Sequence, residues 1–271
     1  FIAAAETGFE HLGILPLLFA LLSTWAGNIY IVGLNQLQDV EIDRINKPFL
    51  PLASGEYSLR TGWLIVVISG IAALGISASQ GSFLFLVIAV SLFIGTAYSL
   101  PPLRLKRFPF WAAISILVVR GIVVNLGLFL YYISTVGENI SIPEHVWALT
   151  IFFVGFGIAI ALFKDIPDIR GDRLFKIRTL AIRVGPKNIF SIGLYVLFAC
   201  YLFLIAVQIT SLIRVHGPSL IGSHLIILSV LWYRSRRVKP DVPASMTSFY
   251  MFVWRLFFIE YIIFPLFCWL R

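Results

Sequence analysis

Two short clusters of polar side chains could bind a metal ion, and each follows a long apolar segment. They consist of Asn35, Asp39 and Asp43 in NQLQDVEID, and of Asp165, Asp168 and Asp172 in DIPDIRGD. Residues three or four positions apart share one face of a helix, so each cluster predicts one acidic helix face. Mg²⁺ prefers such oxygen ligands and often shares them with substrate phosphate oxygens. The clusters therefore predict a catalytic site in which two or more Mg²⁺ ions bridge both faces to a diphosphate.

The elements that must position these clusters are membrane helices. Hydrophobic residues make up 59% of the 271 residues, and apolar runs of about 17 to 25 residues recur, which is the length that crosses a bilayer as a helix. Eight spans are predicted, at residues 12–35, 61–79, 82–100, 109–133, 146–164, 188–211, 218–233 and 247–270. They leave no room for a soluble domain. Residues 1–271 are therefore expected to form a single all-α polytopic membrane bundle, since helices satisfy their backbone groups in lipid.

The basic residues are concentrated on one side of the predicted topology. The segments 35–60, 101–108, 164–187 and 234–241 hold 17 of the 21 Lys and Arg residues. By the positive-inside rule, this side faces the cytoplasm or the stroma of an organelle. Contact with anionic lipid headgroups is an alternative role for these residues. Nucleic-acid binding is not expected, because no soluble basic surface is available for a phosphate backbone.

A structural role for the acids has to be weighed against the metal site. They could cap helices or pair with basic neighbours, namely Arg44, Lys47, Arg170 and Arg173. The chain has 13 Asp and Glu residues, and five of them fall in the two clusters. Ionisable groups at a membrane boundary are a functional hypothesis by default. Each cluster also precedes a basic, glycine-containing loop, which indicates a weak internal duplication around a shared cavity.

A diphosphate would also need cations, and several lie close to the clusters in the sequence. The candidates are Lys106 first, then Arg104 and Arg107 in the same loop, and Lys47 and Lys164 beside the acids. Tyr98 precedes this loop and could stabilise a carbocation by cation–π attraction, or could be an interfacial tyrosine. The two cysteines, Cys200 and Cys268, lie in apolar spans and offer neither a metal spacing nor a disulfide framework.

The polar motifs resemble those of a known family. NQLQDVEID is similar to the N-x-x-x-D-x-x-x-D motif of UbiA-type membrane prenyltransferases, and DIPDIRGD is similar to their second motif, D-x-x-D-x-x-x-D. The stretches GTAYSLPPLRLKRF and VVRGIVVNLGLFL resemble the homogentisate branch of this superfamily. One departure is Leu50-Pro51-Leu52, where most members have Arg-Pro-Leu. Charge for the phosphate must therefore come from Lys47 or another residue.

The resemblance implies a fold of nine transmembrane helices around a central cavity. The first of these helices is expected to be missing here. It implies Mg²⁺-dependent transfer of an isoprenoid, preferably phytyl, from its diphosphate to the ring of homogentisate with loss of CO₂, in tocopherol biosynthesis. The expected location is a cyanobacterial or plastid membrane. The donor chain length stays open between phytyl, geranylgeranyl and solanesyl, and so does the oligomeric state.

The acceptor implied by the resemblance carries a carboxylate, which needs a cation of its own. Arg120, inside a predicted span, is the candidate, although a buried pair with Glu260 explains it equally well. Asn125 is a further candidate for the cavity wall. His145 and His224 are isolated in the sequence and are expected to be interfacial or satisfied core groups.

Other function classes fit less well. A transporter would be expected to place its charged residues along a path through the midplane, whereas these acids lie at one boundary. Alcohol phosphatidyltransferases use a different motif, D-x-x-D-G-x-x-A-R, which is absent here. Soluble isoprenyl synthases are excluded by the mean hydropathy of +0.94. The closest alternative is a prenyltransferase for another phenolic acceptor, such as a flavonoid or a coumarin.

Overall fold

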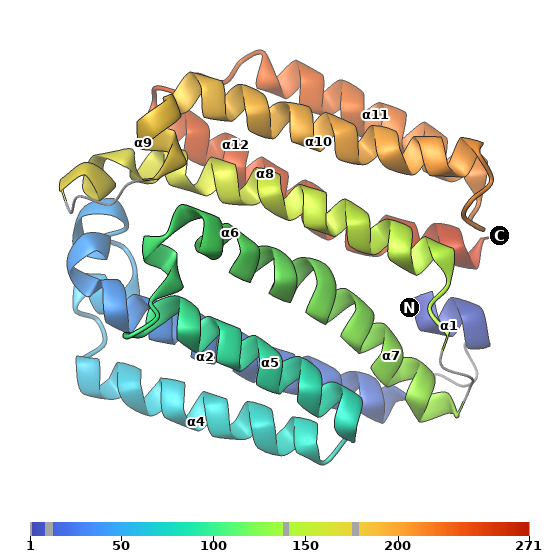
Figure 1. The fold of residues 1–271 in the computed structure, drawn as a ribbon, viewed down its shortest axis with the longest axis horizontal. Coiled ribbons are helices and arrows are strands. Elements are labelled where there is room, and N and C mark those ends of the chain that lie inside the picture. Colours follow the sequence, from blue (N-terminus) through green and yellow to red (C-terminus); the bar gives the residue numbers. More distant parts are fainter. Residues whose placement is uncertain (1, 9–12, 138–140, 175–178, 271) are drawn as a thin grey trace.

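The computed structural model describes residues 2–8, 13–137, 141–174 and 179–270, and this part is an all-helical bundle (Figure 1). The long helices are α2 (Ile14–Asn46), α4 (Leu59–Ala78), α5 (Ser82–Ser99), α8 (Glu144–Leu174), α10 (Pro186–Ile209), α11 (Gly217–Ser235) and α12 (Pro243–Trp269). One further span, Phe110–Val136, combines α6 (Pro109–Leu117), the π-helical turn η3 (Val118–Val123) and α7 (Val124–Val136). The short elements are α1 (Ile2–Thr7), α3 (Pro51–Ser54), η2 (Leu105–Arg107) and α9 (Leu180–Val184).

The described residues contain seven helices that are long and apolar enough to cross a membrane. The predicted span at 218–233 is helical as α11, but it does not reach that apolar character, because it contains Pro218, His224 and several serines. It packs beside α10 and α12. An all-helical polytopic bundle is therefore confirmed, whereas the number of eight spans in this chain stays a prediction.

The helices run side by side, and their ends gather at two opposite ends of the bundle. Figure 1 shows the end of α2, the short helices α3 and α9, and the connection between α5 and α6 together at the left. The α4–α5 and α10–α11 connections lie at the right. The described parts of the four basic segments thus share one end, as the charge distribution predicts. The compartment that this end faces stays a prediction.

Local sequence signals explain several helix boundaries. The side chain of Ser58 accepts a hydrogen bond from the backbone N–H of Thr61 and so caps the start of α4. Gly55 and Gly137 follow α3 and α7 with positive φ angles of 83° and 75°, a conformation that glycine adopts without strain. Pro186 and Pro243 occupy the first turns of α10 and α12, where the missing N–H costs nothing.

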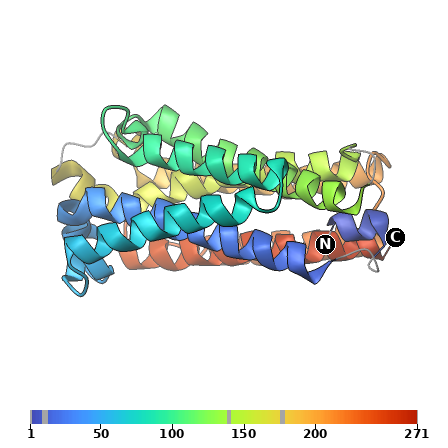
Figure 2. The same cartoon turned by 90° about the horizontal axis from the view of Figure 1, so that it is seen from below.

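The core lies mainly in the second half of the chain, where α8, α10, α11 and α12 pack together. Aromatic rings dominate it, and Phe152 packs edge to face against Tyr201 with centroids 5.2 Å apart. A smaller group of α2, α4 and α5 packs separately around Leu84 and Ala73, which are both fully buried. Figure 2 shows the α6–α7 span on one side of the bundle and α12 on the opposite side.

A buried polar pair joins α11 to α12. His224 Nε2 lies 3.3 Å from Glu260 Oε1, and both side chains are fully buried. The other ring nitrogen of His224 donates to the carbonyl of Leu220 over 2.7 Å. This arrangement corrects one expectation, because the partner of Glu260 is His224 and not Arg120. His224 is a buried core group, but its Nε2 and both carboxylate oxygens of Glu260 form no hydrogen bond with a described residue, so the expectation of a satisfied group is wrong for that nitrogen.

We expect His224→Ala to lower the free energy of unfolding by about 3 to 5 kcal/mol, because it leaves the Glu260 carboxyl buried without its partner. Chemical unfolding in detergent micelles measures this change. The control is the double variant His224→Leu with Glu260→Leu, which removes both polar groups and should recover much of the loss. An equal loss in the single and double variants would contradict the paired role.

Candidate active site

A single large cavity of about 2390 Å³ contains nearly all of the candidate residues. Its wall is formed by α2, α5, the α6–α7 span, α8 and α12, together with the loop around η2. The candidates that line it are Asn35, Asp39, Asp43, Lys47, Tyr98, Arg104, Lys106, Arg107, Arg120, Lys164, Asp165, Asp168 and Asp172. The predicted acidic faces therefore meet at one cavity, as their spacing indicates.

The two acid-bearing helices meet at their C-terminal ends. The last residue of α2, Asn46, fills the space that a side chain at position 171 of α8 would occupy, so this close approach requires Gly171. One residue further, Lys47 Nζ donates to Asp168 Oδ2 over 2.6 Å and joins the first cluster to the second. Because both clusters lie on continuous helices, the helix axes fix their carboxylates with respect to each other.

The first cluster is held by the loop after α5. Lys106 Nζ donates to Asp39 Oδ2 over 2.6 Å and to Asn35 Oδ1 over 3.0 Å. Arg104 donates to the second carboxylate oxygen of Asp39 over 3.3 Å. The short turn η2 thus directs two cations at one aspartate. Burial lowers the pKa of Lys106, and the attraction of Asp39 offsets only part of that effect.

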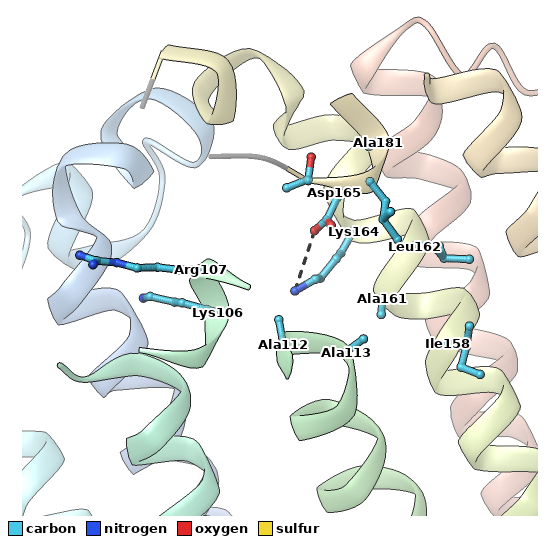
Figure 3. Close-up of a pocket in the computed structure, with 12 residues that line it drawn as sticks. Lys106, Arg107, Ala112, Ala113, Ile158, Ala161, Leu162, Lys164, Asp165 and Ala181 are labelled. Carbon is cyan, nitrogen blue, oxygen red and sulfur yellow. Dashed lines mark ion pairs between the residues drawn. The ribbon is translucent and has the colours of Figure 1, made fainter. Parts of the chain in front are cut away.

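The second cluster has its own lysine, Lys164, at the end of the apolar part of α8. Its ammonium lies 3.9 Å from Asp165 and donates to the hydroxyl of Tyr98 over 3.2 Å. Figure 3 shows Lys164 pointing into a small pocket of about 170 Å³, opposite Ala112 of α6. In the same view, Lys106 and Arg107 point from η2 toward α2. Tyr98 is therefore a cavity residue rather than a lipid-facing belt tyrosine.

Two carboxylates of the clusters have neither a hydrogen bond nor an ion pair with any other described residue. These are Asp43 and Asp172, and each is only 7% exposed. Burial raises the pKa of Asp172 to about 7, and the negative charges of Asp168 and Asp165 add to the effect. Burial alone would lower the pKa of Lys47, but the carboxylate of Asp168 raises it above its usual value. A cation near Asp172 would favour its ionised form.

The acidic clusters could bind Mg²⁺ only if a second ligand, such as a diphosphate, supplied some of the coordinating oxygens. Within the described ranges, no three His, Cys, Asp or Glu side chains lie close enough to hold a metal by themselves. Lys106 and Lys47 contact one carboxylate oxygen each, of Asp39 and Asp168 respectively. Mg²⁺ does not require a closed protein cage, since it uses one or two carboxylates together with waters and phosphate oxygens. The oxygen donors of both clusters suit that mode of binding.

Arg120 and Asn125 were both predicted to line the cavity, but only Arg120 does so. Arg120 lines the cavity, and its guanidinium lies 4.7 Å from the ring centroid of Trp254. Asn125 is not among the cavity-lining residues, which corrects its predicted place. Its amide donates to the carbonyls of Arg120 and Gly121 over 3.2 and 2.8 Å, and it accepts from Tyr261 over 2.9 Å. Asn125 therefore supports the wall from behind.

One feature of the cavity that was not predicted from the sequence is the aromatic face of α12. Tyr250, Trp254, Phe257 and Tyr261 all line the cavity opposite the α6–α7 span. Their spacing of three or four residues places them on one helix face, so the signal was present. The high content of aromatic residues hid it, because 24 Phe, 10 Tyr and 7 Trp are spread over all the spans.

The fold and the site define a class of membrane protein in which two acidic helix ends and a basic loop face a deep aromatic cavity. A model of the UbiA prenyltransferase family matches residues 1–256, and the chain belongs to this family. The homogentisate phytyltransferase of Synechocystis sp. (strain ATCC 27184 / PCC 6803 / Kazusa) is 49% identical to this chain, and the match covers 93% of this chain and 82% of that relative's length. The homogentisate geranylgeranyltransferase of Triticum aestivum is 40% identical over 91% of this chain, which spans 61% of that relative.

The fold is also similar to a solved structure. A UbiA homolog from Archaeoglobus fulgidus, whose structure was determined bound to GPP and Mg²⁺, superposes with a TM-score of 0.66. The alignment covers 100% of this chain and 95% of that homolog's chain. The sequence identity is 19%, so this likeness concerns the arrangement of the helices. The match of the family model to residues 1–256 confirms the resemblance found in the two acidic motifs.

Proposed function

We propose that the protein transfers an isoprenoid, preferably phytyl, from its diphosphate to the aromatic ring of homogentisate, with loss of CO₂, in tocopherol biosynthesis. The observation that carries this proposal is the meeting of both acidic clusters, each paired with a lysine, at one end of a cavity with an aromatic wall. The 49% identity to a cyanobacterial homogentisate phytyltransferase supports the choice of acceptor and donor.

The acidic end of the cavity has the side chains that binding of the diphosphate leaving group requires. Mg²⁺ would be held by the oxygen-bearing side chains of the two clusters, namely Asn35, Asp39, Asp43, Asp165, Asp168 and Asp172. Bound there with the diphosphate, Mg²⁺ would supply positive charge as the allylic C–O bond breaks. Lys106 and Lys47 can turn from Asp39 and Asp168 to phosphate oxygens, and Arg104, Arg107 and Lys164 add further donors. Such fixed donors stabilise the charge that develops on a leaving group.

The deeper part of the cavity suits the cation that remains. Its apolar and aromatic lining excludes water, which would otherwise capture the allylic cation. The ring faces of Tyr98, Trp254 and Phe257 can attract positive charge. The acceptor ring then forms the new C–C bond to the isoprenoid and releases one proton. Loss of the carboxylate as CO₂ leaves a methyl group and takes up one proton, so the overall transfer needs no oxidant.

The proposed location is a cyanobacterial or plastid membrane, with the acidic end of the bundle at the cytoplasmic or stromal surface. Two observations support it: the basic segments gather at that end, and the relatives that are 49% and 40% identical come from a cyanobacterium and a plant. The isoprenoid donor would reach the cavity from the bilayer, and the acceptor from the aqueous side. The preference for phytyl rests on the Synechocystis relative, and the wheat relative makes geranylgeranyl the second donor to test.

An in vitro assay tests this function. The protein, reconstituted in lipid nanodiscs with Mg²⁺, is given homogentisate with phytyl, geranylgeranyl or solanesyl diphosphate, and the products are identified by mass. We expect a prenylated methylquinol that has lost the mass of CO₂, with phytyl used fastest and no product in excess EDTA. Prenylation of a flavonoid or coumarin in place of homogentisate would overturn the choice of acceptor. Full activity in EDTA would overturn the role of the metal.

A further inference from the structure

The feature that the proposed transfer leaves unexplained is an arginine in the middle of a membrane span. Arg120 lies in the π-helical turn η3, within the span Phe110–Val136, and it is accessible from the cavity. Among the described residues, no carboxylate lies within 4.0 Å of it. Glu260, the acid that the sequence suggested as its partner, belongs to His224 instead. The cavity therefore holds a cation at depth that is not used by the acidic clusters.

An arginine at this depth is costly unless an anion or an aromatic face compensates for its lost hydration. The ring of Trp254 supplies part of that compensation from a distance of 4.7 Å. A guanidinium presents paired N–H donors in its plane, and two of them match the oxygens of one carboxylate. The chemistry of this side chain thus suits a planar anion.

The backbone around Arg120 is fixed by a set of specific contacts. A π-helical turn opens the normal hydrogen-bond pattern, and such turns are frequent at functional sites. Here the side chain of Asn125 bonds to the carbonyls of Arg120 and Gly121. Tyr261 of α12 donates to Asn125 and stacks on Phe153 of α8, with the ring centroids 3.9 Å apart. The turn that carries Arg120 is therefore tied to both neighbouring helices.

Close packing against α8 adds to this rigidity. A Cβ atom at position 121 would lie 2.6 Å from Val154 Cγ2 and 3.1 Å from its Cα, so the turn needs Gly121 to approach the helix. Arg120 is thus presented by a segment that cannot easily shift. Preorganised donors of this kind bind a ligand with little ordering cost.

The position of Tyr98 connects this arginine to the diphosphate end of the cavity. Tyr98 lines the same cavity as Arg120, and its hydroxyl accepts a hydrogen bond from Lys164. Lys164 in turn lies beside Asp165 of the second cluster. A small acceptor bound to Arg120 would therefore have Tyr98, and then the acidic end of the cavity, as its neighbours.

We propose that Arg120 binds the carboxylate of the aromatic acceptor and thereby selects phenols that carry a short carboxylate side chain. Asn125 and Tyr261 are positioning residues that act through the π-helical turn. This inference rests on the proposed function only in that the acceptor is an aromatic acid. The cation for the acceptor is separate from the cations for the diphosphate, so the two substrates depend on different residues.

The test measures both substrates in an Arg120→Leu variant. We expect the apparent KM for homogentisate to rise about 30-fold or more, because a charged hydrogen-bonded pair is lost, while the KM for the prenyl diphosphate changes less than about 2-fold. The methyl ester of homogentisate lacks the negative charge, so its inhibition constant should be the same in the variant and the unmodified protein. The control is Arg255→Leu, which removes the arginine of α12 that does not line the cavity.

The possible outcomes separate this inference from the proposed function. A folded Arg120→Leu variant with an unchanged KM for homogentisate overturns the inference and leaves the transfer activity intact. An unmodified protein that does not prenylate homogentisate overturns the proposed function, and the inference with it. If Arg120→Leu does not fold, Arg120→Lys replaces it. This variant keeps the charge but loses the paired donors, so we expect a smaller rise in the same KM, and no rise would overturn the inference.

The positioning role has a separate test. Asn125→Ala and Tyr261→Phe should each raise the KM for homogentisate several-fold with a smaller change in kcat. Adding either change to Arg120→Leu should have little further effect on that KM, because both act through the same guanidinium. Additive effects in the double variants would show that Asn125 and Tyr261 act independently of Arg120.

Discussion

Replacing Asp39 or Asp168 with alanine should reduce turnover about a thousand-fold and leave the protein folded. Each aspartate lies at the point where a lysine meets one of the acidic clusters, at 2.6 Å from Lys106 and Lys47 respectively. Under the proposed mechanism each aspartate would be a ligand of the metal that stabilises the leaving diphosphate, and its loss would remove about 4 kcal/mol of transition-state stabilisation, which corresponds to that factor. Single-turnover assays with homogentisate and phytyl diphosphate measure the rate, and thermal unfolding in detergent checks the fold.

The matched control for these variants is Asp241→Ala. Asp241 lies at the same end of the bundle, where it forms an ion pair of 3.1 Å with Lys187, but it does not line the cavity. Its removal should leave the rate within about 2-fold of the original, since exposed ion pairs contribute little. A folded Asp39→Ala protein that keeps nearly full turnover would show that the first cluster has a structural role.

Lys106→Met should lower kcat/KM for the prenyl diphosphate about a hundred-fold. Its ammonium contacts both Asn35 and Asp39 and is buried enough to interact strongly with an anion in the cavity. Removing one fixed donor to a developing negative charge typically costs a factor of this size. Steady-state kinetics with varied donor concentration measure the loss. The KM for homogentisate should change little, because that substrate depends on Arg120.

Two further variants make this prediction specific. Lys106→Arg should recover part of the activity, because it keeps the charge near the diphosphate. Lys187→Met removes an exposed lysine at the same end of the bundle and should have no measurable effect. Equal losses in Lys106→Met and Lys187→Met would attribute the effect to the general positive charge of that surface.

The sequence predicts the long-range layout of the site well, because hydrophobic length and helical spacing are local properties. The apolar runs identify seven candidate spans among the eight predicted, and the spacing of Asn35 with Asp39 and of Asp165 with Asp168 places each pair on one helix face. The distribution of Lys and Arg also predicts that the acidic clusters and the basic loops share one end of the bundle. These features depend on residues that are close to one another in the chain.

The choice of partners could not be predicted, because it depends on how distant helices are rotated about their axes. Arg120 and Glu260 are the obvious pair by charge, yet α12 turns Trp254 toward the arginine and Glu260 toward His224. Asn125 follows Arg120 closely enough to suggest a shared cavity wall. The π-helical turn directs its amide back to the carbonyls of Arg120 and Gly121 instead.

The ion pairs at the acidic end have a consequence for the order and strength of ligand binding. Lys106 and Lys47 act as internal counterions to the carboxylates of Asp39 and Asp168. A diphosphate that attracts these lysines exposes the carboxylates, and a cation that occupies the carboxylates frees the lysines. Each ligand therefore removes the competitor of the other, and thermodynamic linkage makes this effect reciprocal. The protein should bind free Mg²⁺ weakly and bind Mg²⁺ and prenyl diphosphate synergistically, so that the metal is retained only while a donor is present.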